Sequence, residues 1–119
     1  MNKIKIFDSE LKIMNIIWDK EPITAKEISR LAAETIGWNK NTTYTIIKKL
    51  IEKKAVLRSE PDFLCSSLIN KEQVQFIETK NLIDKLYNGS KKNFFAAFLA
   101  KEKLTEEEIA QLRSMIDKR

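Results

Sequence analysis

The first half of the chain places apolar residues at the three- and four-residue spacing of helices that bury one face. The first such stripe consists of Leu11, Met14, Ile17 and Trp18. It predicts a helix that begins near Asp8 or Ser9, either of which would cap it, and that ends before Pro22. A second helix is predicted to follow Thr24, because Thr24 and Glu27 have the spacing of a capping box.

A third helix, separated from the second by Gly37, is predicted to open around Asn39 to Asn41. Its inward side is predicted to hold Thr43, Ile46, Ile47 and Leu50. Its outward side then holds Asn41, Thr42, Thr45, Lys48, Lys49 and Glu52, together with much of Tyr44. The third helix is therefore expected to present a short, polar and cationic face to the solvent.

Residues 55–69 have a different pattern, in which two short runs are rich in β-branched and apolar residues. The runs read AVLRS and DFLCSSLI, and Glu60-Pro61 separates them. This arrangement predicts a two-stranded hairpin. Three helices followed by a hairpin are the order of a winged helix-turn-helix, in which the hairpin is the wing.

The rest of the chain is again helical in pattern, and its three helices are predicted to begin after the capping residues Asn70, Ser90 and Thr105. The fold class is therefore mainly α, with a winged-helix domain over residues 1–70 and a three-helix domain over residues 71–119. The last two helices carry an apolar set, which consists of Phe94, Phe95, Phe98, Leu99, Leu112, Met115 and Ile116. We expect these residues to form a homodimer interface; the alternative is that they pack against the first domain.

The charge of the chain is concentrated where the third helix and the hairpin lie. The chain has 119 residues and a formal net charge of +5. Residues 40–58 contain six basic side chains and one acidic one, so this segment alone carries as much net charge as the whole chain. A basic face favours an anionic partner such as nucleic acid. The alternative is that the exposed lysines only keep the surface solvated.

The chain lacks the commonest general base and metal ligand of enzymes, which is histidine. The chain has no histidine and a single cysteine, Cys65, and its two glycines do not form a phosphate-binding loop. We therefore predict no catalytic residue, no metal site and no cofactor, and Cys65 is interpreted as a small buried hydrophobe. No signal peptide or membrane-spanning segment is recognised, so we expect a cytoplasmic protein without a membrane partner.

The exposed face of the third helix has the side chains that a major-groove reader needs. Asn41 is suited to a bidentate contact with adenine, and Thr42 and Thr45 offer hydroxyl and methyl groups to bases or phosphates. Tyr44 is expected to reach a phosphate or a thymine methyl group. The cations predicted to contact DNA are Lys40, Lys48 and Lys49 on the helix and Arg58 on the wing. The alternative is an adaptor whose winged helix binds a protein partner.

Two segments, LKIMNIIWDKEPITAKEI and GWNKNTTYTIIKKLIEKKAVLRS, resemble the N-terminal domain of the BlaI/MecI penicillinase-repressor family. The closing LYNGSKKNFFAAFLAKEKLTEEEIAQLRSMIDK resembles the C-terminal domain of that family. The resemblance implies a repressor that binds an inverted-repeat operator as a homodimer and controls resistance or stress genes. Carried over by position, it implies that DNA is contacted by Lys40, Asn41, Thr42, Thr45 and Lys49.

The resemblance also implies an inducing protease, because family members are commonly inactivated by cleavage between an Asn and a Phe. Aligning KEKLTEEEI with the family places this bond at Ala97–Phe98, where Ala97 replaces the Asn. The paired cysteines of the copper-responsive branch are missing, so copper sensing is not expected. Ala55 stands where the family has a glycine before the wing, and the wing tip is Pro61-Asp62 rather than glycine-rich.

Overall fold

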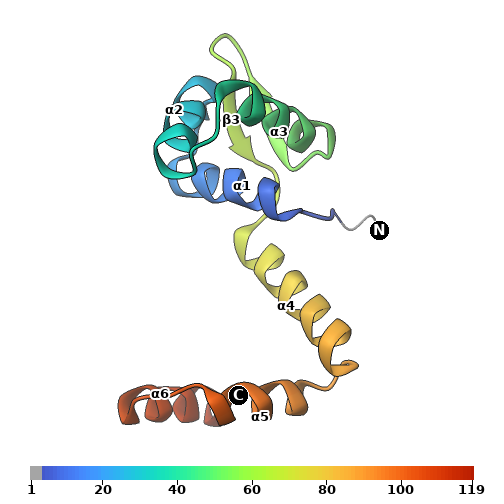
Figure 1. Cartoon of the computed structure of the whole chain (residues 1–119), viewed down its shortest axis with the longest axis vertical. Helices are drawn as coiled ribbons and strands as arrows, with labels where there is room; N and C mark the ends of the chain where they lie inside the picture. The colour runs from blue at the N-terminus through green and yellow to red at the C-terminus, as the bar shows by residue number, and fades with distance from the viewer. Residues whose placement is uncertain (1–3) are drawn as a thin grey trace. The chain divides into compact units, whose positions relative to one another are not determined.

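The computed structural model describes residues 4–119, which form six helices and three short strands (Figure 1). The first elements are α1 (Asp8–Lys20), β1 (Ile23–Thr24), α2 (Ala25–Thr35), α3 (Lys40–Glu52), β2 (Val56–Ser59) and β3 (Leu64–Ser67). They are followed by α4 (Lys71–Tyr87), α5 (Lys91–Lys101) and α6 (Glu106–Asp117). The chain divides into two compact units, one ending at Val74 and the other comprising Gln75–Arg119. The predicted mainly helical fold class is confirmed.

Local capping sets the start of α2. The Thr24 hydroxyl accepts a hydrogen bond from the Glu27 backbone N–H at 3.1 Å, as the capping-box spacing predicts. The Glu27 carboxylate pairs with Arg30 instead of returning to the Thr24 N–H. At the other end of the helix, Gly37 adopts a φ of +82°, and its N–H donates to the Ala32 carbonyl. The positions predicted for both ends of α2 are confirmed.

The first helix is capped differently from the prediction. Its N-cap residue is Phe7, and neither Asp8 nor Ser9 takes that role. The Glu10 carboxylate accepts the Phe7 backbone N–H at 2.8 Å, which satisfies a donor that would otherwise lack a partner at the helix start. The predicted cap was therefore wrong, because the carboxylate three residues after the N-cap takes the place of a short polar side chain at the N-cap itself.

The hairpin predicted within residues 55–69 is present, but the sheet has three strands rather than two. The strand order is β1-β3-β2, and both neighbours run antiparallel to β3. Ile23 lies opposite Cys65 on one side of β3, and Arg58 lies opposite Cys65 on the other. The wing is therefore hydrogen-bonded to the segment between α1 and α2, in addition to following α3 in the chain.

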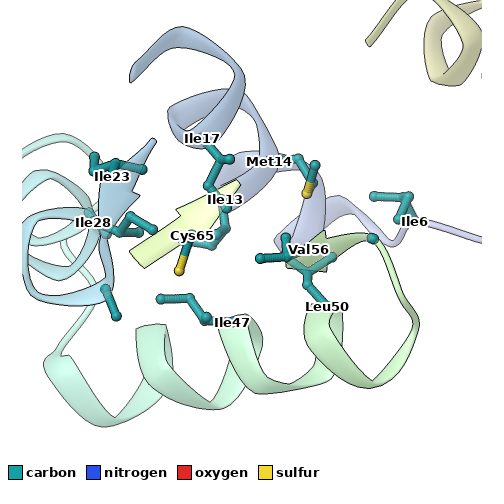
Figure 2. Packing of buried hydrophobic residues seen from close by; sticks show 13 residues of the cluster. Ile6, Ile13, Met14, Ile17, Ile23, Ile28, Ile47, Leu50, Val56 and Cys65 are labelled. Carbon is teal, nitrogen blue, oxygen red and sulfur yellow. The ribbon is translucent and has the colours of Figure 1, made fainter. Parts of the chain in front are cut away.

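The core of the first unit fills the space between α1, α2, α3 and the sheet (Figure 2). Its fully buried large apolar side chains are Ile13, Met14, Ile17, Ile28, Ile47, Leu50 and Val56. Trp18 is half-buried at the edge of this core, and its indole N–H donates to the Ile69 carbonyl at 3.0 Å. Packing of Ile47 and Leu50 therefore fixes which side of α3 faces the solvent.

One polar atom of this core has no partner. The Thr43 side chain is fully buried on the inner side of α3, and its hydroxyl makes no hydrogen bond among residues 4–119. We expect Thr43→Val to raise the free energy of unfolding by about 1 kcal/mol, because valine keeps the shape and removes an unsatisfied buried hydroxyl. Urea unfolding at a fixed protein concentration measures this change.

Thr45→Val is the matched control for this prediction. Thr45 is exposed on the same helix, and its hydroxyl donates to the Asn41 carbonyl at 2.8 Å. Exposed substitutions of this kind change stability by less than about 0.5 kcal/mol. A loss of stability in Thr43→Val would contradict the interpretation that the buried hydroxyl is unsatisfied.

The second unit begins within α4 and contains α5 and α6. Ser90 caps α5 by accepting the Asn93 N–H at 3.1 Å. Thr105 and Glu108 form a complete capping box at the start of α6, with both hydrogen bonds at 3.0 Å. Across residues 4–119, no helix combines the length and the apolar character that crossing a membrane requires.

Candidate nucleic-acid interface

The exposed face of α3 is fixed by the cap and the core contacts of that helix. The Asn39 side chain caps α3 by accepting the Thr42 backbone N–H at 2.8 Å. Thr43, Ile47 and Leu50 are fully buried, and Ile46 is half-buried. The inward face predicted from the spacing is therefore confirmed.

The predicted DNA-contacting residues of α3 lie together on its outer side. The exposed ones are Lys40, Asn41, Thr42, Thr45, Lys48 and Lys49, while Tyr44 is half-buried. The hydroxyl proton of Thr45 is already donated to the Asn41 carbonyl. Thr45 therefore offers a partner its methyl group and the lone pairs of its oxygen, but no hydroxyl proton. The sequence pattern could not reveal this restriction.

The basic residues of this region differ in what surrounds them. Among residues 4–119, Lys48 and Lys49 have no acidic partner within ion-pair distance. The first turn of α3 contains no acidic residue either. By contrast, the Lys53 ammonium lies 2.6 Å from the Glu10 carboxylate and is turned toward α1. The charge count over residues 40–58 therefore overstates the number of cations available to an external anion.

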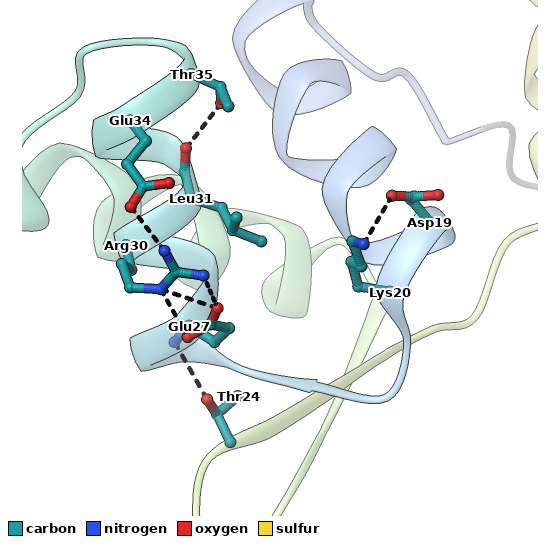
Figure 3. Close-up of polar contacts among 8 residues, drawn as sticks. All are labelled: Asp19, Lys20, Thr24, Glu27, Arg30, Leu31, Glu34 and Thr35. Carbon is teal, nitrogen blue, oxygen red and sulfur yellow. Dashed lines mark hydrogen bonds and ion pairs between the residues drawn. The ribbon is translucent and has the colours of Figure 1, made fainter.

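On α2, the guanidinium of Arg30 is held by acidic neighbours on its own helix (Figure 3). Hydrogen bonding to Arg30 lowers the pKa of Glu27, and the same bond, with the charges of Glu27 and Glu34, raises the pKa of Arg30. The positive charge of Arg30 is thus compensated within α2. Arg30 therefore adds little net positive charge to the surface of the first unit, in contrast to Lys48 and Lys49 of α3.

The wing brings an aromatic residue into contact with α3. The Arg58 guanidinium stacks on the Phe63 ring, with its central carbon 3.6 Å from the ring centroid. The Phe63 ring meets the Tyr44 ring edge to face, at 5.9 Å between centroids. Arg58 also forms an ion pair with Glu60. Sequence reasoning identified Arg58 but missed Phe63, which it assigned only to the apolar run of a strand.

Cys65 is fully buried in the central strand β3. Burial raises the pKa of its thiol to about 11, and the nearby charge of Arg58 only partly opposes this shift. The thiol is therefore protonated at neutral pH and is a poor nucleophile. Within residues 4–119, no group of His, Cys, Asp and Glu side chains has the arrangement of a metal site.

The residues predicted to form a dimer interface lie on α5 and α6 of the second unit. Those that remain exposed are Phe95, Phe98, Leu99, Leu112, Met115 and Ile116. Phe94 is half-buried and packs edge to face against Tyr87, with ring centroids 5.6 Å apart. Ala97 and Phe98, which flank the bond expected to be cleaved, are both exposed within α5.

Comparison with known proteins places nearly the whole chain in one family. Residues 6–118 match the penicillinase repressor family. The methicillin resistance regulatory protein MecI of Staphylococcus aureus (strain N315) is 30% identical over 117 residues, which cover 97% of this chain and 95% of MecI. The penicillinase repressor of Bacillus licheniformis is 28% identical over 120 residues, which cover 98% of this chain and 94% of that repressor.

Two solved structures resemble the first unit. The DNA-binding domain of the repressor BlaI matches with a TM-score of 0.55 and 30% identity, over 60% of this chain and 90% of that domain. Monomeric Bacillus licheniformis BlaI in complex with the blaP half-operator matches with a TM-score of 0.52 and 29% identity, over 60% of this chain and 92% of the solved chain. The family resemblance and the winged helix-turn-helix predicted from the sequence are thereby confirmed. The chain belongs to the penicillinase repressor family.

Proposed function

We propose that this chain is a transcriptional repressor that binds double-stranded operator DNA through α3 and the wing. The observation that carries the proposal is the outer face of α3, which is polar, lysine-flanked and held in place by a buried inner face. Family membership over residues 6–118 supports the same function, since the relatives are repressors and regulators of resistance. Nothing in this function requires catalysis.

The side chains near the N-terminus of α3 would read base edges in the major groove. Asn41 carries both a donor and an acceptor, so its amide matches the N6 and N7 atoms of adenine. Thr42 and Thr45 would meet bases or phosphates, and the Thr45 methyl group would contact thymine. Tyr44 would lie at the edge of this contact, because it is half-buried against Phe63.

The cations around this face would hold the phosphate backbone. They are Lys40, Lys48 and Lys49 on α3 and Arg58 on β2. Each phosphate contact releases condensed counterions, so binding should weaken steeply as salt rises. Phosphate contacts would set the position of α3 in the groove, and the contacts made by Asn41 would supply sequence preference.

The proposed assembly is a homodimer that binds an inverted-repeat operator controlling resistance or stress genes. Its interface would be the apolar face of α5 and α6, where Phe98 is 51% exposed and Met115 is 64% exposed. Side chains of this size are seldom left in water as a group by a soluble protein. An inducing protease remains the further partner that the family resemblance implies. Cleavage at Ala97–Phe98 would divide α5 and so disrupt the proposed interface.

The proposal predicts different effects for the phosphate-binding and base-reading residues. We expect Lys48→Ala with Lys49→Ala to weaken binding to all duplexes alike and to reduce the slope of log affinity against log salt by about 1–2 units. We expect the matched variant Asn41→Ala to lose about 1–3 kcal/mol on a selected operator and little on random DNA. Fluorescence anisotropy titrations at several salt concentrations measure both.

The operator for these titrations comes from selection of bound sequences out of random duplex DNA. Unchanged duplex affinity in the double lysine variant would overturn the assigned role of α3. A chain that binds no duplex but captures a protein through α3 would favour the adaptor function instead. Equal losses for Asn41→Ala on operator and random DNA would mean that Asn41 contacts only the backbone.

A further inference from the structure

A continuous set of contacts runs from the wing to α3. It consists of Arg58, Phe63, Tyr44 and Lys40. The Arg58 guanidinium lies on the Phe63 ring at 3.6 Å, and that ring meets Tyr44 at 5.9 Å with an interplanar angle of 86°. The Lys40 ammonium lies 5.6 Å from the centroid of Tyr44. Phe63 is thus the link between the cation of the wing and the residues of α3.

The backbone of Phe63 is fixed independently of its ring. Its carbonyl accepts the backbone N–H of Ala25, the first residue of α2, at 3.0 Å. Its φ is +52°, in the left-handed region that side-chain-bearing residues rarely adopt. The next residue, Leu64, pairs with both Thr24 and Ser59 in the sheet. Phe63 therefore has a defined place relative to α2, α3 and the wing.

Stacking on Phe63 orients the Arg58 side chain and leaves some of its N–H groups free to donate hydrogen bonds. A guanidinium on an aromatic face keeps its in-plane N–H groups available for oxygen acceptors. Glu60 occupies the Nε edge, where Nε donates to its carboxylate. The terminal amino groups make no hydrogen bond with another side chain or backbone atom of residues 4–119. An arginine of this kind is suited to a phosphate oxygen.

We propose that Phe63 is a positioning residue, which holds Arg58 at a set distance from the base-reading face of α3 so that both engage the same duplex. This inference rests on the proposed DNA-binding function and deepens it. Phosphates and base edges have a fixed separation in a duplex, so a wing cation already held at a matching distance from α3 loses less conformational entropy on binding. The partner of Arg58 is a backbone phosphate beside the groove that α3 occupies.

The test measures how strongly the effect of Arg58→Ala depends on Phe63. In the unmodified chain, Arg58→Ala should weaken operator binding about tenfold and reduce the salt slope by about one unit. In a Phe63→Leu background, the same change should weaken binding by at most about twofold, because Arg58 is already displaced. Phe63→Tyr keeps the aromatic face and should preserve the full effect. Lys49→Ala, on α3, should have equal effects in all backgrounds.

A measurement without DNA separates positioning from general damage to the fold. Relaxation of the Arg58 Nε–Hε group by NMR should report an ordered side chain in the unmodified and Phe63→Tyr proteins and a mobile one in Phe63→Leu. Thermal unfolding verifies that each variant is folded. If Phe63→Leu is not folded, Phe63→Met takes its place, since it keeps apolar volume without a π face.

The outcomes distinguish this inference from the proposed function. The positioning role alone is overturned if the unmodified chain binds operator and Arg58→Ala weakens binding as much in Phe63→Leu as in the unmodified chain. It is also overturned if the Arg58 side chain stays equally ordered in Phe63→Leu. A folded, unmodified chain that binds no duplex overturns the proposed function and the role of Phe63 with it. An Arg58→Ala effect that is lost in Phe63→Leu and kept in Phe63→Tyr, with the Lys49→Ala effect unchanged, supports the inference.

Discussion

A chain carrying Phe98→Glu and Leu99→Glu will sediment as a monomer and bind its operator about 10²–10⁴-fold more weakly than the unmodified protein. Both residues lie on α5 and are about half exposed, at 51% and 46%. In the proposed dimer they would be covered by a second copy, where a carboxylate would be desolvated without a partner. The loss of affinity follows because two half-sites held by one linked dimer have a high effective concentration for each other.

Sedimentation velocity at micromolar concentration measures the first part of this prediction, and operator titration measures the second. The matched control is Asn93→Glu with Ala100→Glu on the same helix. It also lowers the net charge by two, and helical spacing places both exposed positions on the side away from Phe98. Circular dichroism checks that helix content is retained. A Phe98→Glu and Leu99→Glu protein that remains a dimer, or an unmodified protein that is monomeric, would rule out this interface.

The starts of α2 and α6 and the inner face of α3 could be predicted because they depend on neighbours in the sequence. Thr24 and Thr105 cap their helices through residues only three positions away. Thr43, Ile47 and Leu50 face the core because helical periodicity places them on one side. These features need no knowledge of the rest of the chain.

The features that were missed depend on residues far apart in the sequence. β1 has only two residues, too few for alternation to be visible, and its partner Cys65 lies more than 40 positions away. Phe63 reads as one more apolar residue near a strand until the fold brings it against Tyr44. Glu10 reads as a solvated charge at a helix start, yet it is only 2% exposed. Long-range partners decide these roles, and a single sequence does not name them.

The Glu10–Lys53 pair leads to the second large expected effect, which lies in stability. The Glu10 carboxylate accepts hydrogen bonds from the Lys53 ammonium at 2.6 Å and from the Phe7 backbone N–H at 2.8 Å. The Lys53 side chain is 28% exposed, and its ammonium also donates to the Lys5 carbonyl at 2.8 Å. Lys53 therefore has more access to water than Glu10. We expect removal of one partner to change the free energy of unfolding by a different amount from removal of the other.

We expect Lys53→Met to lower the free energy of unfolding by about 3–5 kcal/mol, because it leaves a buried carboxylate without its counter-charge. Glu10→Gln should cost only about 1–2 kcal/mol, since the Lys53 ammonium can turn to water and the amide oxygen still accepts a hydrogen bond. The double variant should be more stable than the sum of the two losses predicts, by about 1–3 kcal/mol. Urea unfolding at one fixed protein concentration measures all three.

Glu34→Gln provides the surface control, because the ion pair of Glu34 with Arg30 is exposed on α2 and should contribute less than about 0.5 kcal/mol to stability.

Operator binding by the Lys53→Met protein gives a second criterion. Lys53 is turned toward Glu10 on α1 and away from the proposed DNA face, so folded Lys53→Met protein should bind operator within about twofold of normal at every salt concentration. Lys48 and Lys49, only a few positions earlier, should show the opposite behaviour, with a clear loss of binding and little loss of stability. Equal losses of unfolding free energy for Glu10→Gln and Lys53→Met, or a reduced salt slope in Lys53→Met, would contradict the assignment of Lys53 to fold stability and of Lys48 and Lys49 to DNA binding.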